Sequence, residues 1–154
     1  PEGQVKENDM KTAIVYYSEH HGNTKKLIDA VTTPDTTLID VTKTDTADLT
    51  PYNLIIFASG IYFSQFEKRV MAFVDKNLAT GKKTALLYTY GAKRDSYTKK
   101  ITEAIQQSGS TVLGSYGCFG FDTFGPFKLV GGIAKGHPNA EEIAGAVKFV
   151  KGLV

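Results

Sequence analysis

The fold is decided by residues 12–28, which read TAIVYYSEHHGNTKKLI. Residues 12–17 form a short apolar and β-branched run, the pattern of a strand that is buried on both faces. A helical pattern begins at Lys25 and continues through Leu27 and Ile28. A buried strand, a short loop and a helix in this order predict the first βα unit of a parallel sheet.

The loop of this unit has the composition of an anion-binding site. The first N–H groups of a helix have no partner within the helix and carry about half a positive charge, so a phosphate placed there meets donors that already point at it. Ser18, Asn23 and Thr24 supply polar side chains, and Gly22 permits close approach of the backbone. We predict a phosphate-binding loop here; the alternative is a well-capped turn with incidental hydroxyl groups.

The loop differs from two common nucleotide-binding motifs. The chain contains no G-x-x-x-x-G-K-[ST] sequence of a nucleoside triphosphate loop and no G-x-G-x-x-G dinucleotide fingerprint. A mononucleotide with one phosphate is therefore the better fit.

Further β-branched and apolar runs alternate with helical patterns along the rest of the chain. This alternation predicts an α/β fold with a parallel sheet. The four additional strands are predicted at residues 37–41, 54–58, 84–88 and 111–116.

Two helix starts carry capping signals. Ser64 followed by Glu67 predicts a capping box that opens the helix after the third strand, and Asn139 with Glu142 predicts one at the last helix. The helix after the fourth strand is predicted to start near Asp95 or Ser96 and to stop at Gly109.

Length and composition favour a single domain. The chain has 154 residues, of which 42% are hydrophobic, as in an ordinary globular protein. We expect this domain over residues 11–154, and we expect residues 1–10 to be a disordered leader or a cloning remnant. No apolar run reaches the roughly 20 residues of a membrane span.

Charge and cysteine content exclude several function classes. The net charge is only +2 and the basic residues are scattered, so a nucleic-acid partner is not expected. The single cysteine, Cys118, cannot form an internal disulfide and leaves no ligand cluster for zinc or iron–sulfur, so no metal is expected. A reducing compartment, the cytoplasm, is the expected location.

At the first loop the chain resembles the flavodoxin family. Ser18 and the trio Gly22, Asn23 and Thr24 resemble the [ST]-x-[ST]-G-N-T phosphate loop of that family. The resemblance implies a three-layer sandwich with a five-stranded parallel sheet of order 2-1-3-4-5 and non-covalent flavin mononucleotide (FMN) at the carboxyl ends of the strands.

The remaining residues of this loop, Glu19, His20 and His21, are included in the predicted cofactor site. His20 departs from the family pattern, which often has a hydroxyl residue there. One phosphate hydrogen bond is then lost or is made by imidazole, and both histidines could equally be surface residues.

The resemblance assigns a second loop to the flavin ring. Residues 58–66 read ASGIYFSQF, and Ser59, Gly60, Ile61, Tyr62 and Phe63 are the expected contacts. The alternative is that Phe63 is a core residue and Tyr62 only amphipathic. Glycine at position 60 would allow a peptide to reorient toward the reduced flavin.

A third loop follows the fourth strand. Thr89, Tyr90 and Gly91 resemble the segment that holds the pyrimidine edge in the family, and Tyr90 either stacks on the ring or faces solvent. Lys93 and Arg94 follow, whereas flavodoxins have acidic flavin surroundings, so we expect a less negative potential here.

Residues 118–138 resemble the glycine-rich tail of broad flavodoxin-family proteins and, distantly, of flavodoxin-like NAD(P)H:quinone reductases. Its phenylalanines, Phe119, Phe121, Phe124 and Phe127, either roof the flavin or cover the sheet edge. Cys118 is expected to be a buried, inert thiol.

Three functions remain open at this point. The first is an electron carrier that meets redox partner proteins or small electron acceptors, and the second is an FMN-dependent NAD(P)H:quinone-type oxidoreductase. The third is a flavodoxin-like binding module that has lost FMN. In the first, the cofactor does the chemistry and no catalytic residue is expected. We expect a monomer or a weak homodimer, without membrane or nucleic-acid partners.

Overall fold

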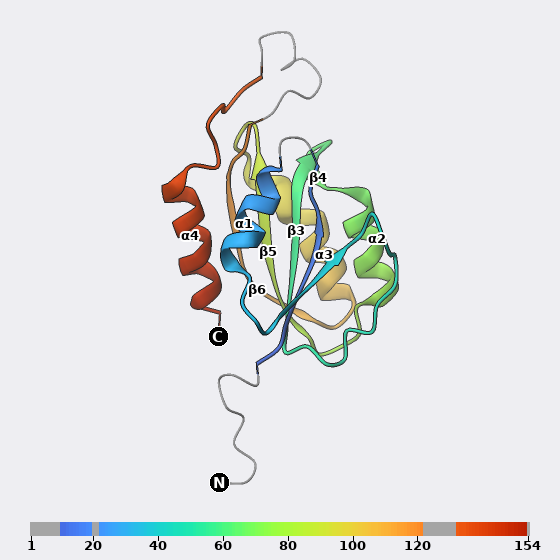
Figure 1. Ribbon diagram of the computed structural model, residues 1–154. Helices are drawn as coiled ribbons and strands as arrows, with labels where there is room; N and C mark the ends of the chain where they lie inside the picture. Colours follow the sequence, from blue (N-terminus) through green and yellow to red (C-terminus); the bar gives the residue numbers. More distant parts are fainter. Residues whose placement is uncertain (1–9, 20–21, 122–131, 154) are drawn as a thin grey trace.

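The computed structural model describes residues 10–19, 22–121 and 132–153 (Figure 1). In these residues, strands and helices alternate as the sequence predicts. They are β1 (Thr12–Tyr17), α1 (Asn23–Val31), β2 (Thr36–Asp40), β3 (Leu54–Tyr62), β4 (Gln65–Phe66), α2 (Lys68–Asn77), β5 (Lys83–Tyr90), the 3₁₀ turn η2 (Asp95–Thr98), α3 (Lys99–Gln107), β6 (Thr111–Phe119) and α4 (Ala140–Lys151).

The parallel sheet has the predicted order. Its strands are arranged β2-β1-β3-β5-β6, which is 2-1-3-4-5 when only the parallel strands are counted. β4 is an addition: it pairs antiparallel to the end of β3, with Ile61 opposite Phe66. In this order, the loops after β1, β3 and β5 lie side by side at the carboxyl edge of the sheet.

Helices cover both faces of the sheet, with α1 and α4 on one face and α2 and α3 on the other (Figure 1). Alternating side chains of β1 serve the two faces: Ile14 packs with α1 and α4, whereas Val15 packs with α2 and α3. β3 is buried along most of its length, as predicted for a strand with helices on both sides. The core thus forms two apolar layers that fix the sheet edge.

The predicted start of α2 is wrong. Phe63 and Ser64 have positive φ angles of 52° and 66° and make the tight turn that joins β3 to β4. The helix begins at Lys68, and the Glu67 side chain caps it by accepting a hydrogen bond from the Arg69 amide. The strand pairing with β3 uses the residues that the capping-box pattern assigned to the helix start.

The other two helix predictions are confirmed, whereas β3, β5 and β6 continue to Tyr62, Tyr90 and Phe119, past the predicted ends at residues 58, 88 and 116. Asn139 and Glu142 form the reciprocal capping box that opens α4. After β5, η2 begins at Asp95 and continues into α3, and Gly109 ends this stretch at a φ of 86°. Within the described ranges, none of the helices has the length and apolar character needed to cross a membrane.

Candidate functional site

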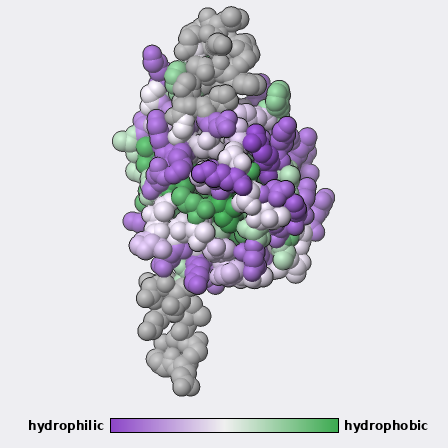
Figure 2. Space-filling view, turned by 45° about the vertical axis from the view of Figure 1, so that its right-hand side comes forward, coloured by the Kyte–Doolittle hydropathy of each residue, from purple (hydrophilic) through white to green (hydrophobic). Residues whose placement is uncertain are grey.

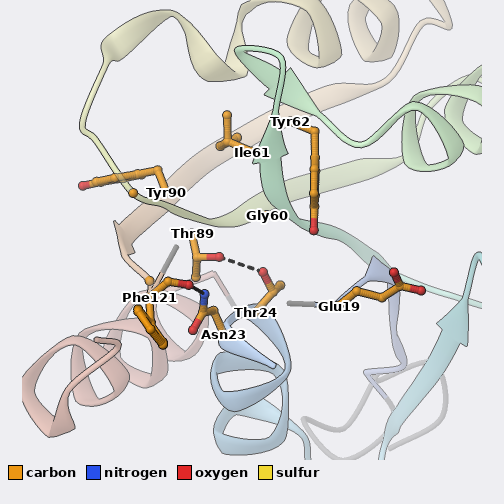
Figure 3. A pocket seen from close by; sticks show the side chains of 11 residues that line it. Glu19, Asn23, Thr24, Gly60, Ile61, Tyr62, Thr89, Tyr90 and Phe121 are labelled. Carbon is orange, nitrogen blue, oxygen red and sulfur yellow. Dashed lines mark hydrogen bonds between the residues drawn. The ribbon is translucent and has the colours of Figure 1, made fainter. Parts of the chain in front are cut away.

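An open cavity lies at the carboxyl edge of the sheet (Figure 3). Ligand sites of parallel α/β sheets are usually found at this edge. Segments from the β1–α1 loop, the ends of β3 and β5, and the segment after β6 enclose it. Its lining residues are Glu19, Asn23, Thr24, Gly60, Ile61, Tyr62, Thr89, Tyr90, Gly91, Gly120 and Phe121.

Helix α1 starts directly after a glycine, Gly22, whose backbone is in the left-handed conformation. Gly22 precedes the helix in the left-handed region, with φ 66° and ψ 28°, and no acidic residue lies in the first turn. The Ser18 Oγ accepts a hydrogen bond from the Lys25 amide at 3.0 Å, so this hydroxyl stabilises the turn below the cavity. A helix start with this backbone and no acidic side chain is compatible with the predicted anion site.

Asn23 is the most informative side chain in the cavity. It is only 9% exposed, and its Nδ2 donates a hydrogen bond to the Phe121 carbonyl oxygen at 2.7 Å. Its Oδ1 is buried and has no hydrogen-bond partner among the described residues. Buried polar atoms are nearly always paired in folded proteins, so this oxygen is suited to accept a hydrogen bond from a ligand.

Gly120 makes room for the Asn23 side chain. A Cβ atom at position 120 would lie 2.8 Å from the Asn23 Cγ, closer than such contacts are in proteins. The β1–α1 loop and the segment after β6 are thus fitted to each other.

A hydrogen bond joins the first and third loops at the floor of the cavity. The Thr24 and Thr89 hydroxyl groups lie 2.9 Å apart and are both buried (Figure 3). This contact ties the first turn of α1 to the end of β5, and it sets the distance between the predicted phosphate loop and the predicted ring site.

Glu19 belongs to a polar cluster on one side of the cavity. It accepts a hydrogen bond from the Tyr17 hydroxyl at 2.8 Å, and the Arg69 guanidinium lies 4.9 Å from the centre of the Tyr17 ring. Burial, followed by the hydrogen bond and the negative charge of Glu19, raises the pKa of Tyr17 to about 12. The Tyr17 ring in turn contacts Tyr62 edge-on, with 5.5 Å between the ring centres.

Ser59 to Tyr62, which were predicted to lie in the second loop, belong to the end of β3, and this strand places them at the site. The Ser59 Oγ donates a hydrogen bond to the Gly60 carbonyl and accepts one from the Glu67 amide at 3.0 Å. Figure 3 shows the Tyr62 side chain extending along the cavity toward the β1–α1 loop. Phe63 is outside the set of lining residues and is 85% exposed, so the alternative that placed it in the core is wrong.

In the third loop, Tyr90 is held by other aromatic side chains. It is 8% exposed, and its ring lies 5.0 Å from that of Phe119 and 5.9 Å from that of Tyr97, centre to centre. Burial is the main cause that raises its pKa. The ring is therefore buried rather than turned to solvent, and its edge still borders the cavity.

The structure thus brings together nine of the residues predicted for the site and places others around them. The nine in the cavity wall are Glu19, Asn23, Thr24, Gly60, Ile61, Tyr62, Thr89, Tyr90 and Gly91. Ser18, Gly22 and Ser59 support this wall without forming part of it. His20 and His21 lie outside the described residues, as do Phe124 and Phe127.

The site also contains Gly120, which the sequence-based prediction omits, and Phe121, which that prediction left open between a roof over the flavin and a cover for the sheet edge. The only signal for them was the run of glycine and phenylalanine after residue 118.

The β1–α1 loop is one residue longer than the family pattern. Ser18 and Gly22 are four positions apart, one more than in the [ST]-x-[ST]-G-N-T pattern.

Cys118 lies beside the cavity wall but is a poor nucleophile. It is 4% exposed, and burial raises the pKa of its thiol to about 12. In the described part of the chain, the histidine, cysteine and acidic side chains form no group of three that could hold a metal ion.

Solved structures with this architecture are flavodoxins and related flavoproteins. A flavodoxin from the domain Archaea matches with a TM-score of 0.67 and 19% identity, covering 90% of this chain and 92% of the other. A flavoprotein of Lactobacillus acidophilus, solved in complex with FMN, matches with a TM-score of 0.56 and 21% identity, covering 71% and 93%. These likenesses define a flavodoxin-like fold.

Sequence similarity assigns the family. The family model described as "Flavodoxin domain" matches residues 14–123. An uncharacterised protein of Methanocaldococcus jannaschii is 36% identical over 150 residues, covering 94% of this chain and 99% of the other. The chain belongs to the flavodoxin domain family.

Proposed function

We propose that the chain is an FMN-binding electron-transfer protein that carries electrons between redox partners. The observation that carries this proposal is the buried Oδ1 of Asn23, which has no hydrogen-bond partner among the described residues and lies in the open cavity at the start of α1. A mononucleotide has a phosphate for the helix start, hydroxyl groups for an acceptor such as this oxygen, and a flat ring for the aromatic side.

The described residues fit the parts of FMN in separate places. The backbone around Gly22 to Thr24 would hold the phosphate, and Asn23 would accept a hydrogen bond from the sugar chain. Ile61 and Tyr62 would border the ring on one side, and Thr89 to Gly91 would offer backbone groups to its polar edge. FMN itself supplies the redox chemistry, and the protein supplies binding, orientation and exclusion of water.

The proposal also includes a location and an assembly state. The single cysteine, Cys118, is buried as a thiol, which suits the reducing cytoplasm. We further propose a monomer or a weak homodimer, which sedimentation analysis at several protein concentrations would test.

FMN binding is tested by titrating the purified protein into free FMN and following flavin fluorescence and visible absorbance. We expect saturation at one FMN per chain. Asn23→Ala is expected to weaken binding about tenfold, because about 1.4 kcal/mol of hydrogen bonding is lost with the side chain. The matched control is Asn53→Ala at the opposite edge of the sheet, where Asn53 Oδ1 accepts from the Lys11 amide.

The outcomes separate the three functions. A protein that stays colourless in excess FMN would be a binding module without flavin, and the proposal would be wrong. Rapid, repeated reduction of quinone by NADH or NADPH in a steady-state assay would instead assign the NAD(P)H:quinone-type reductase. Binding of FMN without such turnover, together with electron exchange with redox proteins, supports the carrier.

A further inference from the structure

Basic side chains open three of the helices whose first turns face the cavity edge. They are Lys25 and Lys26 in α1, Lys68 and Arg69 in α2, and Lys99 and Lys100 in α3, and none of these helices has an acidic residue in its first turn. Helix α4 shows the opposite arrangement, with Glu141 and Glu142 in its first turn and Lys148 and Lys151 in its last.

These basic positions oppose the local electrostatics of the helix. A helix start carries a partial positive charge, so acidic residues stabilise it and basic residues destabilise it. Helix α4 follows this rule and α1 does not. Helix α2 follows it in part, because the Glu67 carboxylate caps it, and so does α3, because the η2 turn that continues into it opens at Asp95; the lysines and arginine of these first turns still oppose the rule. The basic residues at the cavity edge therefore serve something other than the stability of their own helices.

Most of these charges are not neutralised within the protein. Lys25 pairs with Asp29, and Arg69 pairs with Glu67. Among the ion pairs of the described ranges, none involves Lys26, Lys68, Lys99 or Lys100, nor Lys93 and Arg94 just after the cavity residue Gly91. All six of these side chains are exposed, and we call them the basic rim.

Acidic residues do little to balance the basic rim. Glu67 is paired with Arg69, and two exposed carboxylates that the structure describes lie near the six basic residues. They are Glu19, which accepts a hydrogen bond from the neutral Tyr17 hydroxyl, and Asp95 in the stretch from Lys93 to Lys100. Figure 2 shows hydrophilic side chains over much of the face that it presents, around an apolar area near its centre.

An exposed aromatic side chain stands beside the basic rim. Phe63 is 85% exposed at the tip of the β3–β4 turn, and its φ of 52° places it in a region that non-glycine residues seldom adopt. The two-residue hairpin turn requires this geometry, and it holds the Phe63 side chain out from the sheet. β4 packs against η2, so this tip lies next to the segment that follows Lys93 and Arg94. An apolar centre with a charged border is the usual anatomy of a protein interface.

We propose that the basic rim and Phe63 form a docking surface for an acidic redox protein. This inference rests on the proposed electron-transfer function and names the partner's chemistry. Charge complementarity supports this docking surface, because the six unpaired basic residues at the cavity edge attract a negatively charged protein surface. They are spread over three helix starts and a loop, as a surface that meets a protein partner would be, rather than gathered at one point.

The test uses the FMN-loaded protein in its reduced form and two electron acceptors of opposite charge. Rubredoxin, a small acidic iron protein, and cytochrome c, a basic haem protein, are each mixed with it in a stopped-flow spectrometer. For the wild type, the rate constant with rubredoxin is expected to fall about tenfold as ionic strength rises from about 10 to about 300 mM. The rate constant with cytochrome c is expected to stay level or rise.

The decisive variant is Lys99→Glu/Lys100→Glu, because acidic residues at a helix start favour folding. It is expected to slow the reaction with rubredoxin about tenfold at low ionic strength and to speed the reaction with cytochrome c. The control, Lys11→Glu/Lys83→Glu, makes the same charge change at exposed positions on the opposite edge of the sheet and is expected to have little effect. Phe63→Ser is expected to slow the rubredoxin reaction at every ionic strength, whereas Leu113→Ser, at another exposed apolar residue, should not.

The inference is overturned if the Lys99→Glu/Lys100→Glu variant and the control behave alike. It is also overturned if that variant weakens NADPH binding while leaving the rubredoxin reaction unchanged, because the basic rim would then bind nucleotide phosphates. Failure to bind FMN contradicts the proposed function alone. In that case the FMN-free protein is titrated with rubredoxin and followed by NMR, where loss of the contact in the variant supports the docking surface and absence of any contact in the wild type overturns it.

Discussion

At the scale of single residues, the site depends on a fit between Asn23 and Gly120. The Asn23 amide reaches the Phe121 carbonyl oxygen only because position 120 has no side chain. One residue of the β1–α1 loop therefore contacts the cavity and the segment after β6 at the same time. A change at either position is expected to affect both.

Gly120→Ala is expected to destabilise the protein by about 1–3 kcal/mol, because the new Cβ would lie 2.8 Å from Asn23 and force it away from Phe121. For a domain of this size that corresponds to a fall in Tm of about 2–12 °C, measured by circular dichroism. Gly152→Ala is the control, since its Cβ meets only ordinary contacts at 3.5 Å. An unchanged Tm for Gly120→Ala would mean that the two segments do not touch as described.

At the scale of secondary-structure elements, the first turns of the helices differ in charge. Helix α4 has acidic residues at its start and basic residues at its end, as its dipole favours, whereas the first α-helical turn of α3 holds Lys99 and Lys100, after the η2 turn that opens at Asp95. The two helices start at the same edge of the sheet, so the difference cannot come from their general position (Figure 1).

Lys99→Glu/Lys100→Glu is expected to stabilise the protein, because it replaces two unfavourable interactions with the helix dipole by two favourable ones. Each is worth about 0.3–1 kcal/mol at low ionic strength. Urea unfolding in low and high salt would measure the gain, which should shrink as salt screens the charges. Lys148→Glu/Lys151→Glu at the end of α4 should have the opposite effect, and a loss of stability in both variants would contradict the dipole explanation.

At the scale of the whole molecule, a net charge of only +2 hides an uneven distribution around the cavity. The basic rim surrounds the place where bound FMN would gain negative charge on reduction. Long-range charge of this kind affects the reduction potential of a bound cofactor and the rate of association with a partner protein more than it affects the stability of the fold.

Lys93→Gln/Arg94→Gln is expected to lower the reduction potential of bound FMN. At a separation of about 10 Å in water each charge contributes about 0.4 kcal/mol, so the pair should shift the potential by a few tens of millivolts. A dithionite titration at low ionic strength measures the shift, with Lys11→Gln/Lys83→Gln as the control. Equal potentials for variant and wild type would remove the electrostatic effect of these two residues.

The sequence by itself determined the fold and the three loops of the site. Strand and helix patterns depend on local periodicity, and the strand–loop–helix unit at residues 12–28 carries its own backbone signals in Gly22 and the apolar run before it. Tertiary structure alone decided that Ser64 belongs to a turn and not to a helix start, because pairing between β3 and β4 outweighs a local capping preference. It alone decided that Gly120 and Phe121 line the cavity and that Asn23 is left with a buried acceptor, since these depend on contacts about 98 positions apart in the chain.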